Sequence, residues 1–342
     1  MLFVVDPMLQ NLFELPVYAI VALMAALVAA TAVGSRKPGV LAGVFIAAAV
    51  LAGGFAYSQE WGRQLVPIRG YGMMILIGFL LGVWIAARRA HLIGCEKRHV
   101  MDVAIYGVII GLAGARLFHV IMHWHSYNPF TAAGFDFSRV IDMFAIWNGG
   151  LVFYGTFLTV IPWAWAYCRI NKLPAIAFLD LAAPSLIIGL AVGRIGCFLN
   201  GCCYGNLCEL PWGVEFPAGA PAWQWQVNDH LIDKTAAHAR AVHPTQIYAS
   251  IAAALTSAFL YAYWPRRKFN GQIISLMLIM AGTTRFFEEM LRTDEPAAFP
   301  DISASLTIAQ WIAFGIVAAG FAMLAWFSRA PVVGQTFLSA RR

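Results

Sequence analysis

The sequence predicts an all-α integral membrane protein, a bundle of about nine transmembrane helices. Hydrophobic residues make up 61% of the 342 residues, charged residues make up 12%, and the mean hydropathy is +0.70. Soluble domains are nearer half apolar and a quarter charged. Apolar runs of about 20 residues, the length of a helix that crosses a bilayer, recur along the chain.

The net charge and the cysteine count argue against two other classes. The net charge is +6, but the basic residues lie between the apolar runs rather than along one face, so no nucleic-acid partner is predicted. Six cysteines in 342 residues are too few for a disulfide scaffold. The basic residues are interpreted as topology signals and headgroup contacts in a lipid bilayer.

The first apolar run, residues 16–33, is predicted to be an uncleaved helix. Asp6 and Glu14 precede it, and the basic residues Arg36 and Lys37 follow it. A signal peptide has the opposite charge order, with basic residues before the apolar run. The N-terminus is therefore predicted outside, and residues 39–57 return across the membrane as a second helix.

Seven further apolar runs complete the helix count. They cover residues 71–89, 102–122, 151–167, 178–198, 248–264, 271–291 and 306–327. With alternate loops assigned to the cytoplasm, 14 of the 23 basic residues are cytoplasmic: Arg36, Lys37, Arg88, Arg89, Lys97, Arg98, Arg169, Lys172, Arg266, Arg267, Lys268, Arg329, Arg341 and Arg342. This positive-inside bias predicts a plasma-membrane protein whose C-terminus is cytoplasmic.

A long polar segment, residues 204–242, separates the sixth and seventh predicted helices. It carries Trp212, Trp223 and Trp225, and tryptophan is favoured at the membrane–water interface. We expect a folded cap on the outer surface; a disordered polar loop is the alternative.

Several charged groups fall inside the predicted helices, where they usually face the bundle interior. Arg116, His119 and His123 share one helical face, as a polar seam satisfied by backbone carbonyls or as a ligand-facing set. Near the end of the eighth helix, the spacing predicts the ion pairs Arg285–Glu289 and Glu288–Arg292. Asp180 is a further candidate partner for an arginine.

Residues 193–205, GRIGCFLNGCCYG, combine an arginine with several glycines and cysteines at the end of the sixth helix. If Arg194 and Arg285 meet, they repel unless an anion lies between them. Guanidinium groups bind phosphate in a bidentate manner, and the phosphate nearest to hand in a membrane is a phospholipid headgroup. The residues therefore predict a site for a lipid phosphate near the outer leaflet.

Four cysteines, Cys197, Cys202, Cys203 and Cys208, lie in or just after this stretch. Their C-x4-CC-x4-C spacing differs from the common zinc spacings, and no metal site is predicted. Three other interpretations remain: a Cys202–Cys208 or Cys203–Cys208 disulfide, small residues that fill a tight turn, or a thiol that carries a transient lipid.

Nine segments, in order, resemble the prolipoprotein diacylglyceryl transferase family. They are RGYG at 69–72, GARLFHV at 114–120, WNGGLVFYG at 147–155, Asp180 with Pro184, GRIGCFLNGCCYG at 193–205, PWGVEFP at 211–217, HPTQIY at 243–248, RFFEEMLR at 285–292, and residues 305–310. The resemblance implies two additional helices in residues 1–58, a transferase-like membrane domain over 59–330 that includes the cap at 204–242, and a cytoplasmic tail at 331–342.

The resemblance also implies an activity: transfer of a diacylglyceryl group from phosphatidylglycerol to the lipobox cysteine of a prolipoprotein, with release of glycerol phosphate and without a cofactor. The implied catalytic residues are Arg194, Arg285, Tyr154, Glu289 and Tyr71. The implied substrate-binding residues are Arg116, Asn200, Gly205, Gly155, His243, Gln246 and His119.

Three positions depart from the family pattern. The family's HGG on the fifth helix is Tyr154-Gly155-Thr156, so the expected histidine base is absent, and Cys197 and Cys202 replace an asparagine and a glutamate. His119 and His243 are the alternative bases. Two other function classes are considered: a non-catalytic phospholipid-binding protein of the same fold, and a membrane thiol–disulfide protein that uses the cysteines at 197–208.

Overall fold

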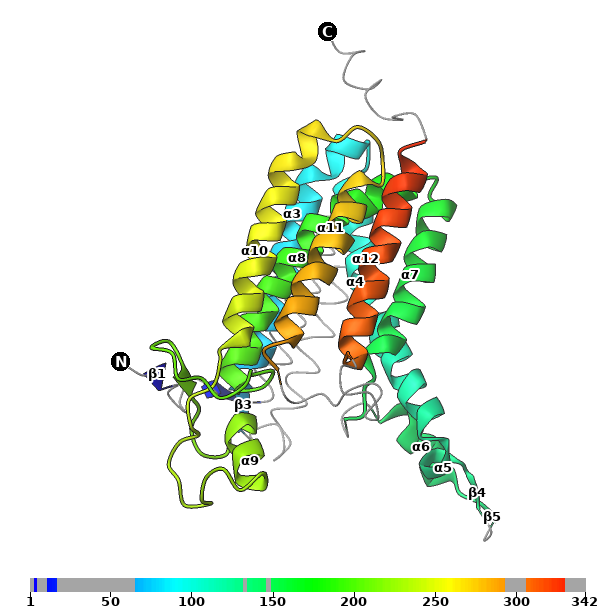
Figure 1. Cartoon of the computed structure of the whole chain (residues 1–342). Helices are drawn as coiled ribbons and strands as arrows, with labels where there is room; N and C mark the ends of the chain where they lie inside the picture. Colours follow the sequence, from blue (N-terminus) through cyan, green and yellow to red (C-terminus); the bar gives the residue numbers. More distant parts are fainter. Residues whose placement is uncertain are drawn as a thin grey trace. The chain divides into compact units, whose positions relative to one another are not determined.

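The computed structural model describes residues 3–4, 11–16, 65–131, 134–145, 149–292 and 306–329 (Figure 1). The chain divides into two compact units, each described here by itself: a larger unit of Met1–Ile85 with Asp180–Arg342, and a smaller unit of Ala86–Leu179. The helices predicted over residues 16–33 and 39–57 lie outside the described residues, except that Pro16 is the last residue of a strand.

Helices dominate the described residues. The long ones are α3 (Gly70–Arg89), α4 (Lys97–Met122), α7 (Phe153–Ile170), α8 (Ala175–Asn200), α10 (Thr245–Tyr263), α11 (Gln272–Glu289) and α12 (Ile308–Phe327). The short ones are η3 (Ala90–Ile93), α5 (Trp124–Tyr127), α6 (Phe137–Phe144), α9 (Pro221–Asn228) and η5 (Trp264–Arg266). Each of the seven predicted helices from residue 71 onward has its counterpart.

Short strand pairs make up the rest of the regular structure. β2 (Asn11–Pro16) pairs antiparallel with β3 (Leu65–Arg69). β1 (Phe3–Val4) pairs parallel with β6 (Val214–Glu215), and β4 (Phe130–Thr131) pairs antiparallel with β5 (Gly134–Phe135). The sequence analysis predicted none of them.

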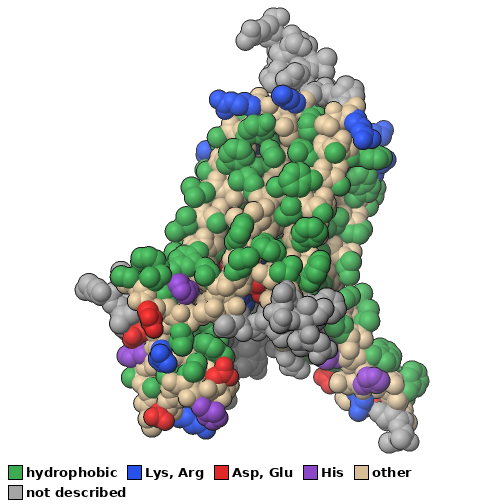
Figure 2. All heavy atoms as spheres, viewed as in Figure 1, with side chains coloured by type: hydrophobic (Ala, Val, Ile, Leu, Met, Phe, Trp, Pro, Cys, Tyr) green, Lys and Arg blue, Asp and Glu red, His purple; other side chains and the backbone are tan. Residues whose placement is uncertain are grey.

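Five helical segments among the described residues are long and apolar enough to cross a membrane. They are Gly70–Ile93, Lys97–Met122, Ala175–Asn200, Thr245–Arg266 and Ile308–Phe327. Hydrophobic side chains cover much of the helical surface in Figure 2, as expected where lipid rather than water is the solvent. The chain is therefore an all-α, multi-pass membrane protein.

Asp180 in α8 fixes the start of α11. Its carboxylate is completely buried and accepts hydrogen bonds from the backbone N–H groups of Gly271, at 2.7 Å, and Ile274, at 2.9 Å. The first N–H groups of a helix have no partner within the helix, so this carboxylate satisfies donors that would otherwise be buried unpaired. The prediction that Asp180 is a partner of Arg285 or Arg292 is wrong, because Asp180 caps the start of α11 and both arginines lie at its other end.

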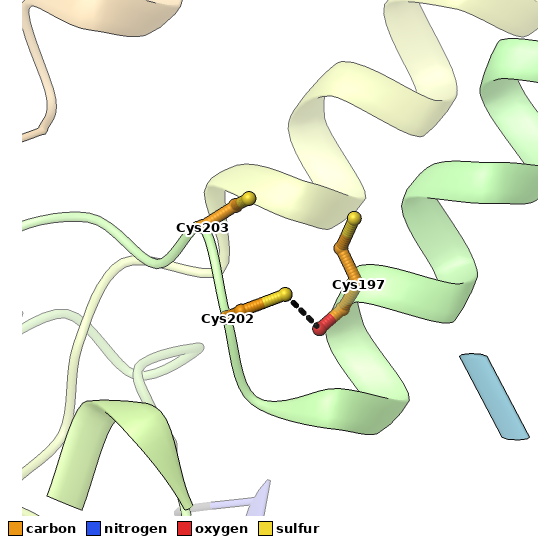
Figure 3. Close-up of side chains that lie close together, drawn as sticks. All are labelled: Cys197, Cys202 and Cys203. Carbon is orange, nitrogen blue, oxygen red and sulfur yellow. Dashed lines mark hydrogen bonds between the residues drawn. The ribbon is translucent and has the colours of Figure 1, made fainter. Parts of the chain in front are cut away.

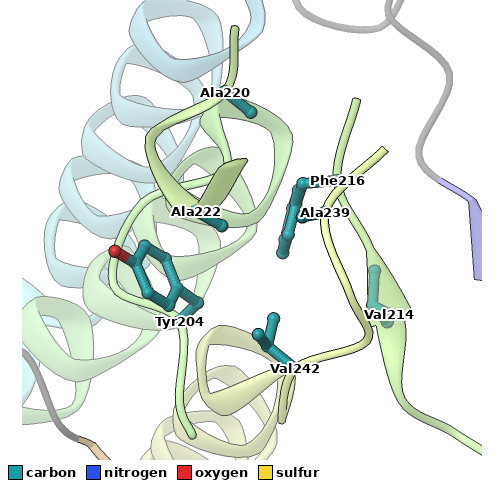
Figure 4. Close-up of a cluster of buried hydrophobic side chains, with 7 residues drawn as sticks. All are labelled: Tyr204, Val214, Phe216, Ala220, Ala222, Ala239 and Val242. Atoms are coloured by element: carbon teal, nitrogen blue, oxygen red, sulfur yellow. The ribbon is translucent and has the colours of Figure 1, made fainter. Parts of the chain in front are cut away.

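Residues 204–242 are folded around their own apolar core (Figure 4). The buried side chains that form it are Tyr204, Val214, Phe216, Ala220, Ala222, Ala239 and Val242. Gln226 is buried beside it, and its amide both donates to the carbonyl oxygen of Arg240 at 3.0 Å and accepts from the Arg240 N–H at 2.7 Å. The alternative of a disordered loop is therefore wrong.

Candidate functional site

An ion cluster joins α8 and α11 within the larger unit. Nη1 of Arg194 lies 3.3 Å from Oε1 of Glu288, and Nη1 of Arg285 lies 3.9 Å from the same oxygen. Nη1 of Arg285 also lies 2.6 Å from Oε2 of Glu289. The two arginines are thus brought together, as the sequence suggested, and the anion that they share in this structure is the Glu288 carboxylate.

Arg292 completes the cluster in a different way from the prediction. Its Nε lies 4.0 Å from Oε2 of Glu289, three residues away, whereas the sequence analysis paired it with Glu288. The structure uses Glu288 for Arg194 and Arg285 instead. Among the described residues, three arginines and two glutamates therefore meet in this cluster.

A cleft opens beside this cluster. Arg194, Arg285 and Glu288 line its charged end. The remaining lining is mostly aliphatic: Ile187, Leu190, Ala249, Ala253, Thr256, Ala281 and Thr284. A cationic end joined to apolar walls matches an amphiphile with an anionic headgroup.

The turn after α8 brings three cysteines together (Figure 3). The Sγ atoms of Cys197, Cys202 and Cys203 lie within 4.8 Å of one another. All six cysteines are free, so the predicted disulfides from Cys208 to Cys202 or Cys203 are wrong; Cys208 is buried and its N–H donates to the carbonyl oxygen of Ala241. Hydrogen bonds from the Cys197 and Cys202 thiols, then the charges of Arg292 and Arg194, lower the pKa of Cys203 against the effect of burial.

A Schellman motif produces this convergence. Gly201 adopts φ +70°, its N–H donates to the carbonyl oxygen of Phe198, and the N–H of Cys202 donates to that of Cys197 at 3.2 Å. The chain therefore folds back so that Cys202 faces the last helical turn, which contains Cys197. The signal in the sequence is Asn200-Gly201 at the end of a helix, where a glycine commonly ends the helix with this motif.

The start of α10 holds the turn in place. Thr245 Oγ1 donates to the carbonyl oxygen of Cys203, and Gln246 Nε2 donates to that of Cys202, both at 2.7 Å. Both side chains are completely buried. Gln246, predicted to bind substrate, therefore positions the cysteine turn.

Gly205 and His243 form the base of the same loop. The Gly205 N–H donates to the carbonyl oxygen of His243 at 2.9 Å. A Cβ at Gly205 would lie 2.6 Å from the carbonyl oxygen of Leu291 and 2.8 Å from Cγ2 of Thr245, so only glycine fits. The ring of His243 lies near Tyr248, with Nδ1 3.4 Å from its hydroxyl oxygen.

Tyr71 and Asn200 also lie beside the turn. A Cβ at Gly196 of α8 would lie 3.1 Å from the carbonyl oxygen of Tyr71, so α3 begins in close contact with the end of α8. The Tyr71 side chain is within electrostatic range of Arg194 and the three thiols. The Asn200 side chain forms a hydrogen bond with the Cys202 thiol.

The remaining predicted site residues belong to the smaller unit. Arg116 is 5% exposed, and it donates to the carbonyl oxygens of Met143, Gly149, Gly150 and Asp142, at 3.0, 2.6, 3.1 and 2.5 Å. This is the polar-seam alternative of the sequence analysis. The ring of His119 stacks on that of His123 at a centroid distance of 4.3 Å.

Tyr154 and Gly155 lie in the first turn of α7. The Tyr154 side chain is exposed, at 57%. Gly155 packs against α4, where an added Cβ would clash with the carbonyl oxygen of Gly114 and approach Cβ of Phe118 to 2.7 Å. Small residues allow such close helix crossings in membranes, so Gly155 has a packing role.

Comparison with known proteins gives one consistent result. A family profile described as prolipoprotein diacylglyceryl transferase matches residues 59–326. Proteins named phosphatidylglycerol–prolipoprotein diacylglyceryl transferase are similar to this chain. That of Finegoldia magna is 30% identical over 75% of this chain and 89% of its own length. Those of Cupriavidus metallidurans and Clostridium tetani are 31% and 34% identical, over 77% and 67% of this chain and 90% and 82% of theirs.

Proposed function

The chain belongs to the prolipoprotein diacylglyceryl transferase family, and on that premise we propose that it transfers a diacylglyceryl group from phosphatidylglycerol to the lipobox cysteine of a prolipoprotein. Glycerol phosphate is the second product. The observation that carries the proposal is the cleft whose charged end holds Arg194 and Arg285 and whose walls are aliphatic.

The charge of the cluster supports a phosphodiester ligand. Phosphatidylglycerol carries one negative charge on its phosphate, and Arg194 and Arg285 already share one anionic oxygen, Oε1 of Glu288, at 3.3 and 3.9 Å. Its phosphate takes the place of the Glu288 carboxylate between Arg194 and Arg285, and its acyl chains follow the aliphatic walls. Planar guanidinium groups suit this ligand because they bind phosphate oxygens in pairs.

The reaction forms one bond and breaks one bond. The acceptor thiolate attacks the glyceryl carbon, an S–C bond forms, and the C–O bond to phosphate breaks. Negative charge develops on the departing phosphate oxygen, where Arg194 and Arg285 stabilise it. Glu289 holds Arg285 at 2.6 Å, and Tyr71 and Asn200 lie beside the approach of the acceptor.

Residues of the smaller unit have supporting roles in the proposal. Arg116 binds the backbone carbonyl group of Gly149, and Gly155 lets α7 pack closely on α4. These contacts stabilise the two helices that carry Tyr154 and His119. His243, Gln246 and Gly205 shape the loop after α8.

The membrane arrangement in the proposal follows the charge pattern of the sequence. In this arrangement the chain crosses the bacterial inner membrane nine times, with its N-terminus outside and its C-terminus in the cytoplasm. Residues 1–58 add two helices to a transferase domain at 59–330, residues 204–242 form an outer cap, and residues 331–342 are a cytoplasmic tail.

A transfer assay tests the proposal. Purified protein is mixed with phosphatidylglycerol labelled in its diacylglyceryl group and with a lipobox peptide, and labelled peptide is measured. Arg194→Ala and Arg285→Ala should each lower transfer by about 100-fold or more. The matched control is Arg98→Ala, since the Arg98 side chain is 71% exposed. If the wild-type protein binds the lipid but never labels the peptide, it is a non-catalytic lipid-binding protein.

A further inference from the structure

We propose that Cys197, Cys202 and Cys203 bind one zinc ion, and that the fourth zinc ligand is the thiol of the acceptor peptide. The proposal rests on the transferase function above and gives the cysteine turn a part in it. Zinc is bound in tetrahedral sites by cysteine thiolates, and catalytic zinc keeps one position for a substrate or water.

The separation of the sulfur atoms fits one ion. Three sulfurs within 4.8 Å of one another leave a point no more than about 2.8 Å from any of them (4.8 Å divided by √3). A Zn–S bond is about 2.3 Å, so each sulfur moves inward by about half an ångström, which small changes in side-chain torsion supply. Figure 3 shows the three side chains entering this space from α8 and from the turn that follows.

The protein holds these ligands in advance. The Schellman motif sets the return of the chain, and Thr245 and Gln246 hold the carbonyl groups of Cys203 and Cys202 at 2.7 Å. Cys203 adopts φ +59°, a backbone conformation that non-glycine residues seldom adopt. Metal sites need this kind of support around their ligands.

Burial separates the three clustered cysteines from the other cysteines of the chain. Cys197, Cys202 and Cys203 are partly exposed, whereas the remaining three cysteines are buried. Cysteines that only fill space are usually buried, as those three are. The partial exposure of the cluster leaves a side open for a fourth ligand.

The position of the cluster suits the chemistry. Cys197 follows Arg194 by three residues in α8, so both lie on one helical face. Cys203 is within electrostatic range of Arg194 and Arg292. An acceptor sulfur bound at the cluster is therefore close to the arginines that hold the lipid phosphate.

Zinc would promote deprotonation of the acceptor thiol, the role of the histidine base that Tyr154 replaces. The acceptor must react as a thiolate, and a thiol that coordinates zinc loses its proton at neutral pH. The proton goes to solvent as the Zn–S bond forms. The sulfur electron pair then forms the S–C bond, the C–O bond breaks, and glycerol phosphate leaves with the electron pair of the broken C–O bond. The thioether product is a weak zinc ligand and dissociates, and zinc changes oxidation state in no step.

Metal binding is tested first, without activity. Full-length protein is stripped with a chelator and titrated with Zn(II) against a chromophoric competitor, and with Co(II), whose thiolate charge-transfer absorption reports the ligands. We expect one ion per chain, absent from the triple Ser variant at positions 197, 202 and 203 and retained in Cys95→Ser/Cys168→Ser. A lipobox peptide should change the cobalt spectrum, and the same peptide with serine for cysteine should not. Binding of Cu(I) alone, or an unchanged spectrum with the cysteine peptide, overturns the proposal.

Activity then separates this proposal from the proposed function. A free cysteine thiol is about 3% ionised at pH 7, so removal of zinc should lower transfer about 30-fold or more. The residual rate should rise about tenfold per pH unit up to about pH 8.5, whereas the zinc-loaded rate stays flat. Cys202→Ser alone should behave like the stripped protein, in case the triple variant does not fold. Transfer that survives stripping and Cys202→Ser unchanged overturns the zinc site only; no transfer under any metal condition overturns the transferase function itself.

Discussion

The Glu288 carboxylate lies 3.3 Å from Nη1 of Arg194, and this ion pair joins α8 to α11 at the charged end of the cleft. The Glu288 side chain is 9% exposed, so the pair is shielded from most solvent. Glu288 therefore occupies the place that the proposed lipid phosphate must take. Substrate binding exchanges one anion for another between the same two arginines.

Replacing Arg194 should lower activity through the loss of bidentate hydrogen bonds as well as the loss of charge. Arg194→Ala should lower kcat/KM by about 100- to 1000-fold, the usual effect of removing one donor that stabilises charge in a transition state. Arg194→Lys should recover only part of this loss, because lysine does not bind phosphate in a bidentate manner. Steady-state transfer kinetics measure both, with Arg98→Ala as the control. Full activity in Arg194→Lys would show that a point charge suffices.

Glu288→Gln should strengthen lipid binding. The substitution removes the carboxylate that Arg194 and Arg285 share, so a lipid phosphate meets less competition. We expect the KM for phosphatidylglycerol to fall several-fold and to depend more steeply on salt. Glu215→Gln, in β6, is the control. A higher KM would mean that Glu288 positions the arginines more than it competes.

Gly205→Ala should destabilise the protein by about 1–3 kcal/mol, the usual cost of overpacking. The new Cβ would lie 2.6 Å from the carbonyl oxygen of Leu291, a backbone atom that cannot move aside cheaply. Gly193→Ala is the matched control, since its Cβ would have no atom within 4 Å. Thermal unfolding of the two variants in detergent should differ clearly; equal midpoints would contradict the tight fit.

Asp180→Ala should destabilise the α8–α11 contact. It leaves the N–H groups of Gly271 and Ile274 without their acceptor in a buried place, at a cost of about 1–3 kcal/mol for each unpaired group. Asp180→Asn retains one acceptor oxygen and should lose less. Thermal unfolding measures both, with the exposed Asp233→Ala as the control. An unchanged midpoint in Asp180→Ala would exclude the capping role.

Cys95 should resist alkylation at neutral pH. Burial, then Cys168 and Glu96, raise the pKa of its thiol to about 11. Alkylating reagents attack the thiolate, so the reactive form is scarce at pH 7.5 and increases about tenfold per pH unit toward pH 11. Mass spectrometry of metal-free protein after iodoacetamide treatment should find Cys203, whose pKa is lowered, modified before Cys95. Modification of Cys95 first, at pH 7.5, would contradict this order.

The sequence predicted the helices well because their signal is local. A run of apolar residues of membrane-spanning length decides a helix such as α12 without reference to its neighbours. The start of α4 was missed by five residues, since its first turns are polar and resemble a loop. The strand pair β2–β3 was missed because its two halves are far apart in the sequence.

The sequence predicted that Arg194 and Arg285 meet, and they do. It did not predict which carboxylate pairs with which arginine. Helical spacing allows Glu288 to pair with Arg292 equally well, and only the packing of α8 on α11 decides in favour of Arg194. The cysteine cluster depends on a glycine turn and on two side chains of α10. The spacing of residues within 193–205 gives no information about those two side chains.

The chain leaves the cysteine turn and returns to it at one point. The Gly205 N–H donates to the carbonyl oxygen of His243, and the His243 N–H donates to that of Asn206, both at 2.9 Å. The residues between these two positions therefore form a closed excursion with its own core, clamped at its neck. A change in the length or sequence of this excursion therefore leaves the geometry beneath the neck in place.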